Sequence, residues 1–114
     1  MNDCLFCKIG AGQIKSDVVY EDQRVMAFRD LTPKAPVHIL IIPKKHIERV
    51  SAVTEPDFGI FADLHRAAQH VAKSQNVFES GFRLITNNGK DAGQTVNHLH
   101  YHLLGGKAMT WSPV

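Results

Sequence analysis

The segment His98–Leu104 places three histidines at every second position, with apolar or aromatic residues between them. Strict alternation of this kind predicts a β-strand, in which successive side chains point to opposite faces. The imidazoles of His98, His100 and His102 are therefore expected on one face of a sheet. Because imidazole titrates near neutral pH, a row of three indicates chemistry more than packing.

The spacing of the row limits what it can do. Same-face neighbours on a strand lie about 6.6–6.8 Å apart, and Zn–N bonds are only about 2.0–2.1 Å long. One metal ion can hardly be held by all three histidines, so different roles are expected for them. The glycines of Gly93-Gln94-Thr95 and Gly105-Gly106 would let backbone amides approach an anion. Histidine beside such groups suits nucleophilic attack on phosphorus.

Periodicity elsewhere predicts a single α+β domain over residues 1–114. A short helix is expected over Phe6–Ala11, and a long helix after a capping hydroxyl at Thr54, up to about Ser74. Strands are expected over residues 18–20, 25–28, 38–42, 82–86 and 98–104, the first two as a hairpin. The prediction is a five-stranded antiparallel sheet with one long helix and a short N-terminal helix.

Composition excludes several classes of partner. The net charge of +2 is small and the basic residues are scattered, so nucleic acid is not an expected partner. No apolar run approaches the ~18 residues of a membrane span, and no signal-peptide pattern opens the chain. A cytoplasmic protein without membrane contact is expected.

The two cysteines, Cys4 and Cys7, form a Cys-x-x-Cys motif at the N-terminus. A structural disulfide is not expected in a reducing compartment, and a thioredoxin-like pair would need a preceding strand. The motif is therefore half of a zinc site or two ordinary small residues. His46 alone carries no signal and is expected on the surface.

The segment His98–Leu104 resembles, without a gap, the signature of the histidine triad (HIT) family. The resemblance covers nearly the whole chain, through segments 4–9, 28–31, 36–46, 93–95 and 104–106 and through Asn87. The tail Met109–Pro113, which contains Trp111, is similar to the histidine triad nucleotide-binding branch rather than the dinucleoside-hydrolysing branch.

This resemblance implies a purine nucleoside 5′-phosphoramidase of the adenosine 5′-monophosphoramidase type. His100 would attack the α-phosphorus to form a nucleotidyl-histidine, and water would release the nucleoside monophosphate. His102 would orient His100 through its backbone and pair with His38 beside the phosphate. Thr95 completes the implied catalytic set.

The resemblance also implies how the nucleotide binds. Asn87 and Thr95 would contact phosphate oxygens or the leaving group, and Asp30 would accept hydrogen bonds from both ribose hydroxyls. Four apolar residues would sandwich the purine, although simple core packing is the alternative for them: Phe6, Ile14, Phe28 and Leu31. Gly93, Gln94 and Trp111 complete the expected binding set, together with His100 and His102.

Two further expectations come from the family. Some members hold a structural zinc with residues matching Cys4, Cys7, His46 and His98, a closed tetrahedral set. A homodimer is implied, with the long helix and the fourth strand at its interface. Lys15, Asn97 and Tyr101 depart from the usual pattern, but none of them is an assigned catalytic residue.

Two alternatives to the phosphoramidase remain at this stage. The first is a dinucleoside polyphosphate hydrolase, against which Trp111 and the short tail argue. The second is a nucleotide-binding regulatory module in which catalysis is incidental.

Overall fold

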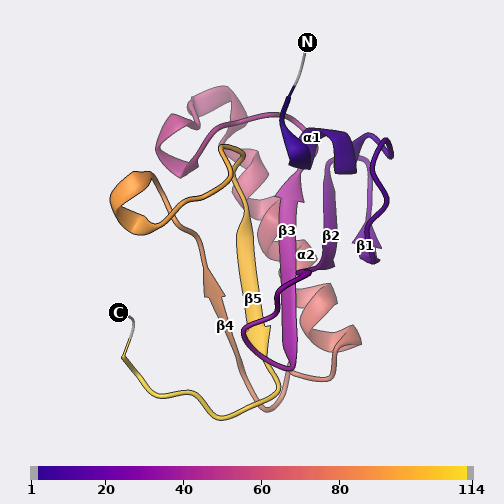
Figure 1. Cartoon of the computed structure of the whole chain (residues 1–114), viewed down its shortest axis with the longest axis vertical. Helices are drawn as coiled ribbons and strands as arrows, with labels where there is room; N and C mark the ends of the chain where they lie inside the picture. The colour runs from indigo at the N-terminus through magenta and orange to yellow at the C-terminus, as the bar shows by residue number, and fades with distance from the viewer. Residues whose placement is uncertain (1–2, 113–114) are drawn as a thin grey trace.

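The computed structural model describes residues 3–112, whose strands form one sheet in the order β1-β2-β3-β5-β4 (Figure 1). All neighbouring strands pair antiparallel. The strands are β1 (Val18–Glu21), β2 (Val25–Arg29), β3 (Val37–Pro43), β4 (Phe82–Ile85) and β5 (Tyr101–Gly105). The helices are α1 (Leu5–Gly10) and α2 (Gly59–Ser74), with 3-10 turns at Val50–Ala52, Glu55–Asp57 and Lys90–Ala92. The predicted fold class is confirmed.

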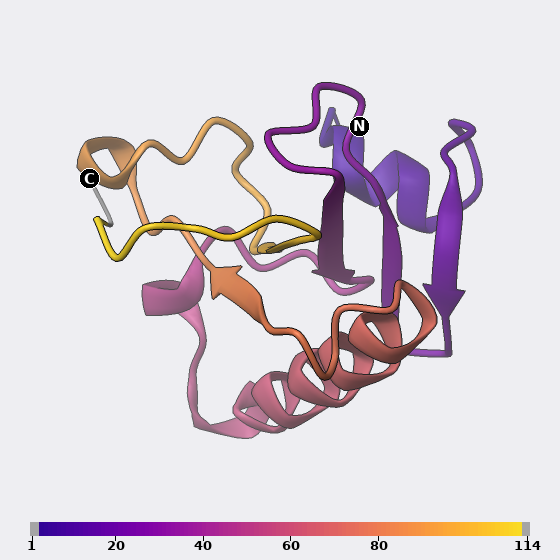
Figure 2. The same cartoon turned by 90° about the horizontal axis from the view of Figure 1, so that it is seen from below.

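The central strand β3 lies between two layers, with α2 on one face of the sheet and α1 on the other (Figure 2). Its apolar run explains this position, because alternate side chains enter different cores. Ile39 and Ile41 pack in the core beneath α2, whereas Leu40 and Ile42 pack with Phe6 on the α1 side. The site histidines also lie on the α1 side, where the short helix leaves part of the sheet uncovered.

Strand β5 begins at Tyr101, so the strand predicted over residues 98–104 is wrong in its first three residues. The amide of Leu99 donates to the carbonyl of Ile47, at 2.7 Å, and this contact comes from a loop rather than from the sheet. The alternation of faces nevertheless survives. Leu99 joins the core beneath α2, while His98 packs edge-on against Phe6.

The starts of both helices differ from the prediction. Thr54 makes no side-chain capping bond, and the segment after it is the 3-10 turn that precedes Gly59, so the predicted hydroxyl cap is wrong. Helix α1 begins at Leu5, and the Sγ atom of Cys4 accepts a hydrogen bond from the amide of Cys7. Within residues 3–112, no helix has both the length and the apolar character needed to cross a membrane.

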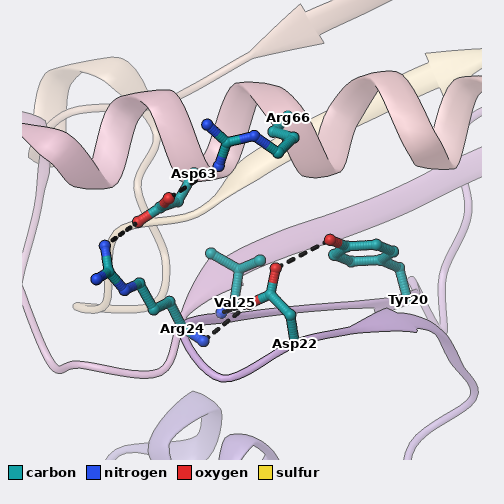
Figure 3. Close-up of polar contacts among 6 residues, drawn as sticks. All are labelled: Tyr20, Asp22, Arg24, Val25, Asp63 and Arg66. Carbon is teal, nitrogen blue, oxygen red and sulfur yellow. Dashed lines mark hydrogen bonds and ion pairs between the residues drawn. The ribbon is translucent and has the colours of Figure 1, made fainter.

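The predicted β1–β2 hairpin is confirmed, and Figure 3 shows how its turn is fixed. The carboxylate of Asp22 accepts hydrogen bonds from the amides of Arg24 and Val25, at 2.8 and 2.9 Å, and from the Tyr20 hydroxyl. Arg24 then reaches Asp63 on α2, with 3.3 Å between nitrogen and oxygen. The turn is thereby tied to the helix that covers the opposite face from the site.

Candidate functional site

Three imidazole rings form a row on the α1 side of the sheet. The ring centroids of His100 and His102 are 5.0 Å apart, and those of His102 and His38 are 5.2 Å apart. His38 and His100 are buried, and His102 is half-buried. Nε2 of His38 lies 2.9 Å from Nδ1 of His102, which is the pairing expected from the resemblance.

Hydrogen bonds assign the protons along this row. The amide of Lys34 donates to Nδ1 of His38 at 3.0 Å, so a neutral His38 carries its proton on Nε2. That proton is donated to Nδ1 of His102, which leaves the His102 proton on Nε2.

The nucleophile candidate is held by a different contact. Nδ1 of His100 donates to the carbonyl oxygen of His98 at 2.7 Å, so Nε2 of His100 keeps a lone pair. The expectation that the backbone of His102 orients His100 is therefore corrected. The carbonyl that orients this ring belongs to His98.

All three rings are held neutral by their surroundings. Burial lowers the pKa of His38 and of His100, although Asp30 acts in the opposite direction on both. Burial, followed by the charges of His100 and His38, lowers the pKa of His102 to about 4. At neutral pH the row therefore offers lone pairs and N–H donors rather than positive charge.

This lowering predicts how stability depends on pH. An unfolded histidine has a pKa near 6.5, so the unfolded chain takes up protons below that pH that a folded His102 binds only near pH 4. The free energy of unfolding should therefore fall as the pH drops from about 6.5 towards about 4. Urea unfolding at a series of pH values measures it.

Two variants separate this effect from the titration of carboxylates. His102→Gln removes the group and should reduce the slope of the pH dependence in that window, because the contributions of His38 and His100 remain. His65→Gln changes an exposed histidine of α2 and should keep the wild-type slope. An unchanged slope in His102→Gln would contradict the assignment.

A cleft of about 320 Å³ opens beside His100. Phe6 and Phe28 form part of its wall, and the Phe6 ring packs in T-shaped contacts, with its centroid 5.6 Å from that of Phe28 and 5.0 Å from that of His100. The expected residues that line it are Phe6, Ile14, Phe28, Asp30, Leu31, Thr95, His100 and His102. Of the four apolar residues, Phe6 and Phe28 are buried in the core as well, whereas Ile14 and Leu31 are exposed at the rim.

Asp30 is fixed at the mouth of this cleft. Its Oδ1 accepts hydrogen bonds from the amide and the hydroxyl of Thr32, at 2.8 and 3.2 Å. Its Oδ2 lies 3.5 Å from Nε2 of His38. The carboxylate therefore belongs both to the rim of the cleft and to the histidine row.

Four expected binding residues lie elsewhere. Gln94 holds backbone together: its amide nitrogen donates to the carbonyls of Glu48 and Val96, and its oxygen accepts from the amide of Gly89. Gly93, with φ of 81°, ends a 3-10 turn. Trp111 is 86% exposed on a tail that runs past the edge of β4 (Figure 1), and Asn87 lines a separate hollow.

A second hollow, of about 260 Å³, lies on the other side of His102. We call it the β4–β5 hollow. It shares Asp30, Thr32 and His102 with the cleft, and it adds Lys34, His38, Ile85, Asn87 and Leu104. Lys34 was not among the site residues expected from the sequence. The two prolines that flank it, Pro33 and Pro36, predict only a loop and say nothing of which side chains face the site.

Four further side chains converge behind the cleft. Nδ1 of His98 lies 3.2 Å from Sγ of Cys4, 3.5 Å from Sγ of Cys7 and 3.3 Å from Nδ1 of His46. Sγ of Cys7 is 3.2 Å from Nδ1 of His46. A zinc tetrahedron with ordinary bond lengths separates its ligand atoms by about 3.3–3.8 Å, so this set could hold a metal ion.

The donor chemistry agrees with that geometry. Nε2 of His98 donates to the carbonyl of Pro43 at 2.7 Å, which directs the lone pair on Nδ1 towards the sulfur atoms. A second hydrogen bond of this kind is usual for metal-bound histidine. His98 therefore links the cysteine–histidine cluster to the histidine row. Its ring faces the cysteines, and its carbonyl accepts the hydrogen bond from His100.

Comparison with known proteins agrees with this architecture. The model of the HIT domain family matches residues 11–109. An uncharacterized HIT-like protein of Synechocystis sp. is 44% identical over 97% of this chain and 96% of its own length. A HIT family hydrolase from Clostridium thermocellum is 50% identical, with a TM-score of 0.97, over 100% of this chain and 99% of that one. A histidine triad nucleotide-binding protein from Candida albicans is 28% identical, with a TM-score of 0.80, over 96% and 87%. This chain therefore belongs to the HIT family.

Proposed function

We propose that this protein is a purine nucleoside 5′-phosphoramidase that acts through a nucleotidyl-histidine intermediate. The observation that carries the proposal is the state of His100. The Nδ1–H group of His100 donates a hydrogen bond to the backbone carbonyl of His98. His100 also lines the cleft that has the Asp30 carboxylate at its mouth. A buried neutral imidazole with a lone pair on Nε2 is a nucleophile already in its reactive form.

The cleft suits a nucleoside. Phe6 and Phe28 line the cleft with aromatic side chains against which a purine ring would pack, with Ile14 and Leu31 at the open rim. Asp30 would accept hydrogen bonds from the ribose hydroxyls, for which its Oδ2 offers two lone pairs while Oδ1 accepts from Thr32. Thr95, exposed at the cleft, would donate its hydroxyl to the phosphate.

In the first step, Nε2 of His100 forms a bond to the α-phosphorus and the P–N bond breaks. The electron pair of that bond stays on the leaving amine, which takes one proton from solvent, relayed through Nε2 of His102, so that His102 is again neutral after the transfer. In the second step, the oxygen of water bonds to phosphorus, one proton of that water returns to solvent through His102, and the histidine–phosphorus electron pair returns to His100. His38 keeps His102 in the tautomer that this exchange requires.

The proposal includes a structural zinc ion held by Cys4, Cys7, His46 and His98. Such an ion would fix α1 and the His98 backbone, and it takes part in no chemical step. It also includes a cytoplasmic homodimer formed through α2 and β4. Strand β4 supports the dimer, since it lies at the edge of the sheet and an unpaired edge invites a partner.

A panel of substrates tests the function. Adenosine and guanosine 5′-phosphoramidates should both be hydrolysed, with kcat/KM values within about tenfold of each other, because apolar walls distinguish the purines weakly. Dinucleoside polyphosphates should be turned over at least about a hundredfold less efficiently. The opposite ranking would favour the dinucleoside hydrolase. Binding of nucleoside monophosphate without turnover of any substrate would favour the regulatory module.

A further inference from the structure

The β4–β5 hollow is placed to receive what leaves the phosphorus. His100 lines the cleft and not the hollow, His38 lines the hollow and not the cleft, and His102 lines both. The row of rings therefore runs from the nucleophile to the hollow. In an in-line displacement the leaving group departs on the side away from the nucleophile. Attack from His100 would direct it across His102 into this hollow.

The charges of the hollow are separated. Asp30 lies at the boundary with the cleft, where its Oδ1 accepts hydrogen bonds from Thr32 and its Oδ2 lies 3.5 Å from Nε2 of His38. Lys34 supplies the cation on the hollow side, and its charge contributes to the lowered pKa of His38. Among residues 3–112, no carboxylate lies within ion-pair distance of the Lys34 ammonium.

Asn87 adds a directed donor. One hydrogen of its amide group is donated to the carbonyl of Ala92, at 2.8 Å, which fixes the orientation of the group. The other hydrogen and the oxygen remain for a molecule in the hollow. Together with Lys34, this amide is suited to a carboxylate.

We infer that the β4–β5 hollow binds the leaving group and that Lys34 selects amines that carry a carboxylate, such as N-linked amino acids. In such a substrate the nitrogen bonded to phosphorus lies beside His102, and the carboxylate two bonds away extends towards Lys34. The inference rests on the proposed phosphoramidase and names the substrate class that it prefers. The expected preference is modest, because Lys34 is exposed and water screens its charge.

The experiment compares two substrates that differ only in charge: the adenosine 5′-phosphoramidates of glycine and of glycinamide. Wild-type protein should favour the glycine compound in kcat/KM by roughly threefold to fivefold, and the ratio should shrink as salt is added. Lys34→Met should bring the ratio close to one, Lys34→Glu should invert it, and Lys34→Arg should retain it. The ratio within one preparation does not depend on the fraction of active protein.

The controls separate this inference from the proposed function. Lys44→Met removes a cation that pairs with Glu21 of β1, the strand at the opposite edge of the sheet from β4. This variant should keep the wild-type ratio. The Lys34 substitutions leave intact the backbone amide that donates to His38. Turnover of both compounds with one ratio in wild type and all Lys34 variants would overturn the inference alone. Turnover of neither compound by wild-type protein would overturn the proposed function.

Discussion

Replacing His100 with alanine is expected to lower the turnover of adenosine 5′-phosphoramidate by roughly three orders of magnitude or more. The substitution removes the nitrogen that would form the covalent bond, and among residues 3–112 no other imidazole that lines the cleft donates to an orienting carbonyl. Binding of adenosine monophosphate should persist, because the contacts proposed for Phe28 with the purine and for Asp30 with the ribose would remain. Steady-state kinetics and calorimetric binding measure the two effects separately.

A matched variant and a direct observation support this measurement. His65→Ala alters an exposed histidine of α2 and should retain wild-type turnover. Acid-quenched wild-type protein should carry an adenylyl group, seen as added mass on the peptide that contains His100. A loss of activity below tenfold in His100→Ala would rule out this residue as the nucleophile.

Most of the fold could be predicted from the sequence because the patterns that indicate strands, helices and turns are local. Alternation gave the strands, helical spacing gave α2, and the β1–β2 hairpin followed from a short polar turn. The predicted start of β5 was wrong because alternation indicates which face of the sheet a side chain takes. It does not indicate which backbone group the amide of that residue donates to. Leu99 keeps its face in the core while its amide donates to Ile47.

The site was partly predictable for the same reason. The residues of the cleft came from a family resemblance, and the structure brings most of them together. Gln94 lies outside because its amide satisfies backbone groups of Glu48 and Gly89, contacts that no local pattern contains. Lys34 was missed because the direction of a loop side chain depends on the sheet beneath it. The approach of Cys4 to His98, 94 positions away, likewise depends on the whole fold.

Freshly purified protein that has met no chelator is expected to carry about one zinc ion per chain. Cys7→Ser should reduce that content to near zero, because a neutral hydroxyl replaces a thiolate in a four-ligand set. Cys7 is the better cysteine to change, since Cys4 also caps α1. Metal analysis of both proteins gives the stoichiometry, and metal-free wild-type protein would contradict the zinc assignment.

Loss of the ion should also lower the melting temperature, by about 5–15 °C, because the metal binds only the folded chain. Lys8→Ser introduces the same residue at a neighbouring position of α1 that is outside the ligand set, and it should change neither metal content nor melting temperature by a comparable amount. Wild-type protein stripped with a chelator should regain its melting temperature when zinc is returned, whereas Cys7→Ser should not.

Cys7→Ser should also lower kcat, although none of the four metal-binding residues would touch the phosphorus. The His98 carbonyl sets the tautomer of His100. Phe6, which lies between Cys4 and Cys7 in the sequence, packs its ring against His98 and His100. Loss of the ion would leave the His98 ring held by its hydrogen bond to Pro43 alone, which would loosen the His98 carbonyl, so a smaller fraction of His100 would present its lone pair to the cleft. The Nδ1 and Nε2 nitrogen shifts of His100, measured by NMR, report this tautomer directly. A variant that has lost zinc but keeps both the tautomer and kcat would confine the metal to a purely structural role.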